Sequence, residues 1–145
     1  MRRIMRITRW FRIMGFLLAV SCVLPVLGCG ITKGEKTEKV KDLDFTVVEE
    51  ADLPDALKAL IEEKKKEPMK LSYSNEEYMY IVVGYGEQRS GGYSISVDEL
   101  YLTENAIYIK TTLIGPKEDE KVTQAATWPY VVIKIELREE PVVFE

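Results

Sequence analysis

The sequence predicts an α+β domain, with one amphipathic helix and a mostly antiparallel β-sheet of about five to seven strands. Two observations support this fold class. Apolar residues recur at helical spacing in one segment, residues 53–61, and from residue 70 onward they recur at every second position. Turn-forming residues interrupt the second pattern, so strand follows strand along the chain. We assign residues 43–145 to this single domain, after a signal peptide (residues 1–28) and a polar tether (residues 29–42).

Residues 1–28 have the features of a bacterial lipoprotein signal peptide. Five arginines and no acid accompany the apolar stretch 16–27, which has the length of a signal h-region and is short for a bilayer span. Residues 26–29, Val-Leu-Gly-Cys, fit the lipobox, whose cysteine thiol takes the diacylglycerol. We therefore expect Cys29 to be the lipidated mature N-terminus, which anchors an extracytoplasmic protein to the cell membrane or envelope. The alternative is an uncleaved anchor helix, but the helix breakers Pro25 and Gly28 favour cleavage.

Composition restricts the function of the remaining chain. The signal peptide holds five of the 20 basic residues and none of the 24 acids, so residues 29–145 carry a formal charge of −9 and are not expected to bind nucleic acid. The sequence has no histidine, and its two cysteines are Cys22 and Cys29. The predicted domain therefore lacks the usual general base, the imidazole and thiol ligands of metals, and disulfides. We expect a protein without enzymatic activity, metal or cofactor.

A short strand and the helix follow the tether. Residues 45–48, Phe-Thr-Val-Val, alternate weakly and predict the strand. Asp52 is the candidate N-cap of the helix, Pro54 lies in its first turn, and Pro68 ends it. The lysines at 64–66 predict a solvated helix end rather than a lipid-headgroup patch, because acids flank them. The apolar face of the helix consists of Leu53, Ala56, Leu57, Leu60 and Ile61.

The remaining residues predict strands. Residues 78–85 are apolar on both faces, which predicts a central strand. The apolar residues stand at odd-numbered positions in residues 93–97 and at even-numbered positions in residues 100–102. This shift around Asp98-Glu99 predicts a β-bulge.

A hairpin turn at residues 103–106 leads into a strand that breaks at Gly115-Pro116. The last long strand is expected to point Val131, Ile133, Ile135 and Leu137 inward, and residues 142–144 add a short closing strand.

Three groups of residues admit a functional interpretation beside a structural one. Gly84, Gly86, Gly91 and Gly92 could cradle a phosphate, but a strand follows them instead of a helix, which favours a structural loop with glycines at positive φ. Tyr78, Tyr80 and Tyr108 could line an exposed binding face or pack on the sheet. The acids Asp98-Glu99 and 118–120 could pair in catalysis, although neighbouring strand residues point to opposite faces.

Two stretches carry a resemblance to a known family. Residues 86–93, Gly-Glu-Gln-Arg-Ser-Gly-Gly-Tyr, precede a Ser-Ile-Ser-Val strand, and residues 122–130, Val-Thr-Gln-Ala-Ala-Thr-Trp-Pro-Tyr, precede the last long strand. In this order they resemble the signature stretches of the PrcB C-terminal domain family, a family of bacterial lipoproteins that belong to protease complexes. The resemblance covers residues 78–136. It implies a lipid-anchored, non-catalytic component that associates with a surface subtilisin-like protease and its adhesin partner.

No catalytic residue is transferred by this resemblance. Thr127 and Gln124 can hydrogen-bond to nearby backbone, and the Trp128–Pro129 peptide bond is one that can adopt the cis form. The candidate structural or interaction motif consists of Gly91, Gly92, Tyr93, Gln124, Thr127, Pro129 and Tyr130.

The expected function is therefore that of a membrane-anchored interaction or accessory subunit, in particular of an extracytoplasmic protease complex. Its expected partners are the membrane, through the lipid at Cys29, and another protein. The alternative is a small-ligand or glycan-binding domain on the cell surface that uses tyrosines as stacking platforms. An enzyme that acts through carboxylates is a third interpretation.

The lipobox assignment gives the first testable prediction. We expect Cys29→Ala to block cleavage, so that the full-length precursor accumulates, because the signal peptidase acts on the lipidated cysteine. Labelling with a palmitate analogue, followed by electrophoresis, measures this. Cys22→Ala is the matched control and should be labelled and cleaved like the wild-type protein. Unlabelled or freely secreted wild-type protein would show that the assignment is wrong.

Overall fold

The structure is a computed structural model that describes residues 38–145. The predicted signal peptide, Cys29 and most of the predicted tether lie outside the described residues. Within residues 38–145 no helix is long and apolar enough to cross a membrane.

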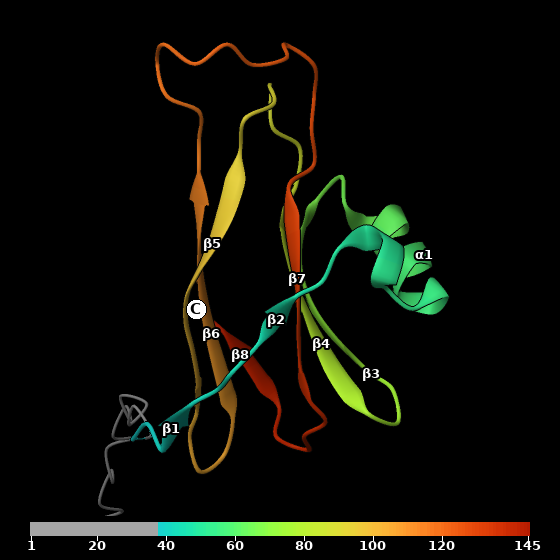
Figure 1. Cartoon of the computed structure of the whole chain (residues 1–145), viewed down its shortest axis with the longest axis vertical. Coiled ribbons are helices and arrows are strands. Elements are labelled where there is room, and N and C mark those ends of the chain that lie inside the picture. Colours follow the sequence, from blue (N-terminus) through green and yellow to red (C-terminus); the bar gives the residue numbers. More distant parts are fainter. Residues whose placement is uncertain (1–37) are drawn as a thin grey trace, which may run out of the picture. The chain divides into compact units, whose positions relative to one another are not determined.

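In the described part of the chain, residues 38–145, eight strands form two four-stranded sheets (Figure 1). All neighbouring strands are antiparallel except β6 and β8, which are parallel. Sheet A has the order β1-β5-β6-β8, with β1 at Lys41–Asp42, β5 at Ser94–Leu102, β6 at Ile107–Ile114 and β8 at Val142–Phe144. Sheet B has the order β2-β7-β4-β3, with β2 at Thr46–Val47, β7 at Tyr130–Glu136, β4 at Tyr78–Tyr85 and β3 at Pro68–Ser74.

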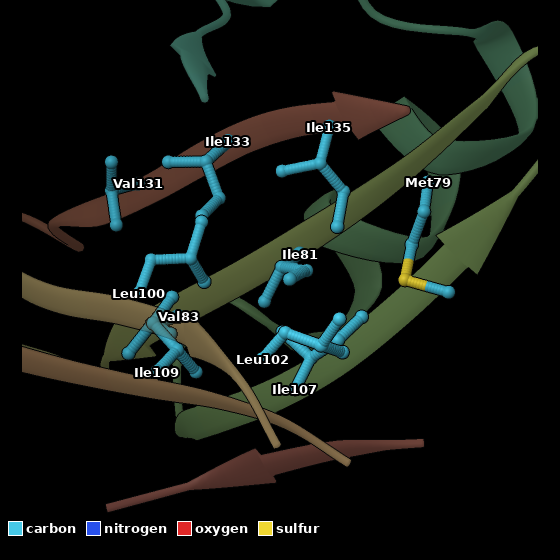
Figure 2. Packing of buried hydrophobic residues seen from close by; sticks show 10 residues of the cluster. All are labelled: Met79, Ile81, Val83, Leu100, Leu102, Ile107, Ile109, Val131, Ile133 and Ile135. Carbon is cyan, nitrogen blue, oxygen red and sulfur yellow. The ribbon is translucent and has the colours of Figure 1, made fainter. Parts of the chain in front are cut away.

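The main core lies between the two sheets (Figure 2). Alternate side chains of β4 and β7 face alternate side chains of β5 and β6, as the period of two in each strand requires. Ile81, Ile107 and Ile133 at its centre are fully buried. Ten buried residues form this core: Met79, Ile81, Val83, Leu100, Leu102, Ile107, Ile109, Val131, Ile133 and Ile135.

The helix α1 (Asp55–Lys64) covers the other face of sheet B. Leu57 and Ile61, one helical turn apart, pack with Leu53 against Met69, Tyr80, Val82 and Val132 of that sheet. The predicted N-cap is wrong. Asp52 ends a short 3₁₀ helix, η1 (Glu50–Asp52), and α1 begins after Pro54, which makes no side-chain cap. Ala56 of the predicted apolar face is exposed, because the buried stripe is narrow.

The predicted α+β class is confirmed, with one α-helix among the described residues. The prediction of a single sheet of five to seven strands is wrong, since eight strands divide between two sheets. The chain crosses between the sheets in each of the connections β1–β2, β4–β5, β6–β7 and β7–β8. The longest crossings are residues 86–93 and 115–129, which replace tight hairpins. Period-two patterning identifies the faces of a strand but not the sheet to which the strand belongs.

Three local predictions are confirmed. β4 is central in sheet B and buried on both faces. The pairing of β5 with β6 shifts register between Val97 and Glu99, which is the predicted bulge. Residues 103–106 form the predicted turn, in which the Thr103 N–H donates to the Ala106 carbonyl (2.9 Å).

Two predictions about strand ends need correction. Leu137 is 46% exposed, because β7 ends at Glu136, where its partner strand β4 also begins. The predicted tether reached residue 42, but β1 pairs with β5 and the Val40 N–H donates to the Leu102 carbonyl (2.8 Å). The folded part therefore includes Val40. Such short polar strands carry no apolar periodicity by which they could be recognised.

The longer of the two edge strands of sheet B is β3, which has seven residues and one neighbour. Met69 and Leu71 face the helix, so Lys70 between them points to the opposite side, toward sheet A. Its Nζ lies 6.0 Å from the centre of the Phe144 ring of β8. A lysine on the inner side of an edge strand opposes pairing with another chain, because such pairing would bury the charge.

The bulge generates the second prediction. Without Asp98 the two halves of β5 lose the phase slip, so either Ile95 and Val97 or Leu100 and Leu102 must turn away from the core. Loss of two leucines from the core costs about 3–6 kcal/mol, a large part of the stability of a small domain. We expect deletion of Asp98 to prevent folding or to lower the free energy of unfolding by this amount, measured by urea denaturation.

Deletion of Asp119, in an exposed turn outside the sheets, is the control and should cost less than about 1 kcal/mol. Equal stability of both deletion variants would contradict the role of the bulge.

Candidate functional site

Two loops that are distant in the sequence meet at one end of the sandwich (Figure 1). Residues 86–93 connect β4 to β5, and residues 115–129 connect β6 to β7; we call them the paired loops. Gln88 and Thr127 exchange backbone hydrogen bonds of 2.8 and 3.0 Å, as in a β-bridge. The Gly91 N–H donates to the Thr123 carbonyl (2.8 Å). The stretches that carried the family resemblance are therefore joined to each other through their backbones.

Side chains reinforce the pairing. The Thr127 hydroxyl donates to the Ser90 carbonyl (2.7 Å), and the Gln88 side-chain amide donates to the Tyr85 carbonyl (3.3 Å). The Tyr85 N–H donates to the carbonyl of Pro129 (3.1 Å), which follows a trans Trp128–Pro129 bond. Several backbone groups of these irregular segments thus find partners across the loop pair, which fixes the two loops relative to each other.

Two glycines are required by this geometry. Gly86 and Gly92 have φ of 69° and 82°, in the region that favours glycine, so the predicted positive φ is found at these two positions. A Cβ atom on Gly92 would lie 2.5 Å from Val122 Cγ1 and 2.9 Å from Pro116 Cβ. Gly91 differs, because a Cβ there would meet Thr123 at an ordinary 3.6 Å. Gly92 therefore permits the close approach of the two loops.

The other predicted motif residues have separate surroundings. Tyr93 lies against Gly115, at the start of the opposite loop, while Gln124 is exposed and its amide reaches the Val122 carbonyl at 3.4 Å. Tyr130 begins β7 and its hydroxyl donates to Glu50 Oε2 (3.2 Å). Burial and the nearby Glu50 carboxylate raise the pKa of Tyr130. Its hydroxyl therefore stays protonated and fastens β7 to the segment that precedes α1.

Trp128 was not among the predicted site residues, although it lies within the second stretch. Its indole Nε1 is buried and has no hydrogen-bond partner. Lys65, at the end of α1, places its Nζ 5.7 Å from the indole ring, and the Glu87 N–H donates to the Lys66 carbonyl (3.2 Å). The end of α1 thus adjoins the paired loops. The tryptophan itself was visible in the sequence, but its contact with the helix joins residues too distant for any local pattern.

The tyrosines do not gather on one face. Tyr78 and Tyr80 lie on the helix side of sheet B, where Tyr80 is 6% exposed and Lys134 lies over Tyr78. Tyr101 and Tyr108 stack on each other on the outer side of sheet A, with ring centres 5.2 Å apart. The interpretation of Tyr78, Tyr80 and Tyr108 as one binding face is therefore wrong, because sheets A and B present them in opposite directions.

The carboxylates also have separate local partners. The Thr112 hydroxyl donates to Asp98 Oδ2 (2.6 Å), and this bond, with a second one from Ser96, lowers the pKa of Asp98. Glu99 lies 3.9 Å from Lys110 instead. Glu120 accepts the Lys117 N–H (3.1 Å) in its own turn. Asp98 is thus held as an anion, unsuited to the role of a general acid.

A shallow depression lies in the β7–β8 loop, lined by residues 137–140. Arg138 and Glu140 form an ion pair there (3.6 Å). Among residues 38–145, no three acidic side chains are placed to hold a metal ion. The paired loops are consequently the most distinctive arrangement in the described chain.

Comparison with known proteins also points to the part of the chain that contains the paired loops. Residues 79–136 match the sequence model of a family described as PrcB C-terminal. This part of the chain is similar to the PrcB C-terminal family. The match begins in β4 and ends with β7, so the PrcB region comprises the main core strands and both paired loops. The recognition made from residues 78–136 is confirmed. Neither the curated proteins nor the solved structures include a significant match to this chain.

The contrast between two neighbouring glycines of the PrcB region gives the third prediction. Gly92→Ala should lower the free energy of unfolding by more than about 2 kcal/mol, because the left-handed backbone and the contact with Val122 both oppose a Cβ atom. Gly91→Ala, the matched control, should change it by less than about 1 kcal/mol. Thermal and urea denaturation measure both values. Similar effects of the two substitutions would show that the close approach at Gly92 is unimportant.

Proposed function

We propose that this protein is a membrane-anchored, non-catalytic accessory subunit that binds another protein of the cell envelope, specifically an extracytoplasmic protease. The observation that carries the proposal is the PrcB C-terminal match over residues 79–136. This match contains both paired loops, so the segment shared with the family includes a surface feature as well as core strands.

The chemistry of the chain supports a binding role over a catalytic one. The sequence has no histidine, and the candidate carboxylates Asp98, Glu99 and Glu120 each engage a different local partner. An active site needs several polar groups that converge on one position. A protein without such convergence acts on its surroundings mainly by binding, and binding to a folded partner stabilises that partner by mass action.

The lipobox supports the membrane anchor. A lipid at Cys29 would confine the domain to the same surface as an envelope protease, which raises the effective concentration of both partners. Even a weak interface would then be substantially occupied.

The fourth prediction tests this function. Deletion of the gene should lower the amount of one envelope protease several-fold while its transcript stays constant, because an unbound partner is degraded more readily. Quantitative proteomics of the envelope, in parallel with transcript measurement, gives both values. Wild-type protein should restore the protease, and Cys22→Ala should restore it equally well, whereas Cys29→Ala should not.

Unchanged levels of every envelope protease would contradict the accessory role. If a soluble glycan or other small ligand raised the melting temperature of the purified protein in that case, the ligand-binding alternative would replace it.

A further inference from the structure

We infer that the partner docks on the paired-loop end of the domain, through the uncharged run Thr123, Gln124, Ala125 and Ala126 with Arg89 beside it. This inference rests on the proposed function and adds the surface on which it operates. The matching surface on the partner is that of a folded protein, uncharged at its centre and with a carboxylate that receives Arg89.

The two ends of the sandwich differ in charge. The β3–β4 turn, the β5–β6 turn and the β7–β8 loop share one end, as the Leu137 N–H donates to the Glu77 carbonyl and the Ile107 N–H donates to the Pro141 carbonyl. Within these two turns and the β7–β8 loop the one basic residue is Arg138, which is paired with Glu140. The β1 segment adjoins this end with Lys39 and Lys41, and Lys39 is paired with Asp42. The acids of the turns and the loop, with the end of β7, are Glu76, Glu77, Glu104, Glu136, Glu139 and Glu140. We call this end of the sandwich the acidic end.

The paired-loop end is nearly neutral. Its loops contain four acids and three basic residues, and the lysines at the end of α1 adjoin them through Lys65 and Lys66. The centre of a protein interface is depleted of charge, and arginine is enriched there. Residues 123–126 are exposed and uncharged, and the Gln88–Thr127 bridge places the neighbouring Arg89 and Ala126 on adjacent strands of backbone.

The exposed loop residues do not serve the core of the domain. Gly92, Thr127 and Tyr85 hold the loops together. The side chains of Thr123 and Arg89 make no hydrogen bond or ion pair within the described residues, and those of Ala125 and Ala126 are exposed. Loops that are fixed by a rigid scaffold and expose free side chains are the common arrangement of binding surfaces.

The segment that precedes the domain joins it at the end opposite the proposed docking surface. Val40 and Lys41 pair with Leu102 next to the β5–β6 turn, so the chain joins the domain at the acidic end. Strands of eight or nine residues separate this point from the paired loops. The anchor and the proposed docking surface therefore do not compete for the same space.

The fifth prediction compares substitutions at the two ends in the full-length protein. Ala126→Arg and Arg89→Glu should fail to restore the protease in the deletion strain, whereas Glu104→Arg and Arg138→Glu at the acidic end should restore it. All four positions lie outside the main core, so each variant should retain the wild-type melting temperature, which verifies the fold. A photoreactive amino acid at Gln124, but not one at Glu104, should crosslink to that same protease.

The outcomes separate the two proposals. If deletion of the gene changes no protease level, the accessory function fails and this inference fails with it. If deletion lowers a protease but the acidic-end variants abolish restoration and the paired-loop variants do not, the accessory function stands and the docking surface is wrong. Crosslinking from Glu104 in place of Gln124 would overturn the inference in the same way.

Discussion

The structure depends on the fact that the central strands of sheet B are apolar on both faces. β4 and β7 direct Ile81 and Ile133 to one side and Val82 and Val132 to the other, so each face requires its own cover. Sheet A supplies one cover and α1 supplies the other. The need for two covers explains why a short chain builds three layers. It also explains why β5 and β6 form part of a second sheet instead of extending sheet B.

The departure of that hairpin determines where the paired loops form. The chain leaves sheet B after β4 and returns to it at β7, and both crossings occur at the same end. Two irregular segments are thus brought together with unpaired backbone groups that need partners, and they find these partners in each other. Gly92 allows the close approach, and Thr127 adds a side-chain bond. The candidate surface of the PrcB region is therefore a consequence of how its core is covered.

Sequence patterns predicted what is local in this fold. The helix, the central position of β4, the bulge at Asp98 and the turn at Thr103 each leave a signature within a few residues. The division into two sheets and the pairing of Gln88 with Thr127 were not predictable, because they join residues whose separation no periodicity records. For the candidate site, the sequence singled out the two stretches that pair with each other in the structure, and it predicted the positive φ found at Gly86 and Gly92. It could not distinguish the glycines that shape the loops from the exposed residues between them, nor connect Trp128 to Lys65.

Lys70, on the inner side of β3, affects how this edge of sheet B can pair with a second molecule. An edge strand of seven residues is long enough to template an identical strand, and repetition of that step would build a continuous ribbon of molecules. Lys70 lies on the inner side of this strand, with its ammonium group near the Phe144 ring of sheet A. Each added copy would desolvate one such charge. The charge of Lys70 therefore opposes the addition of a second chain along this edge.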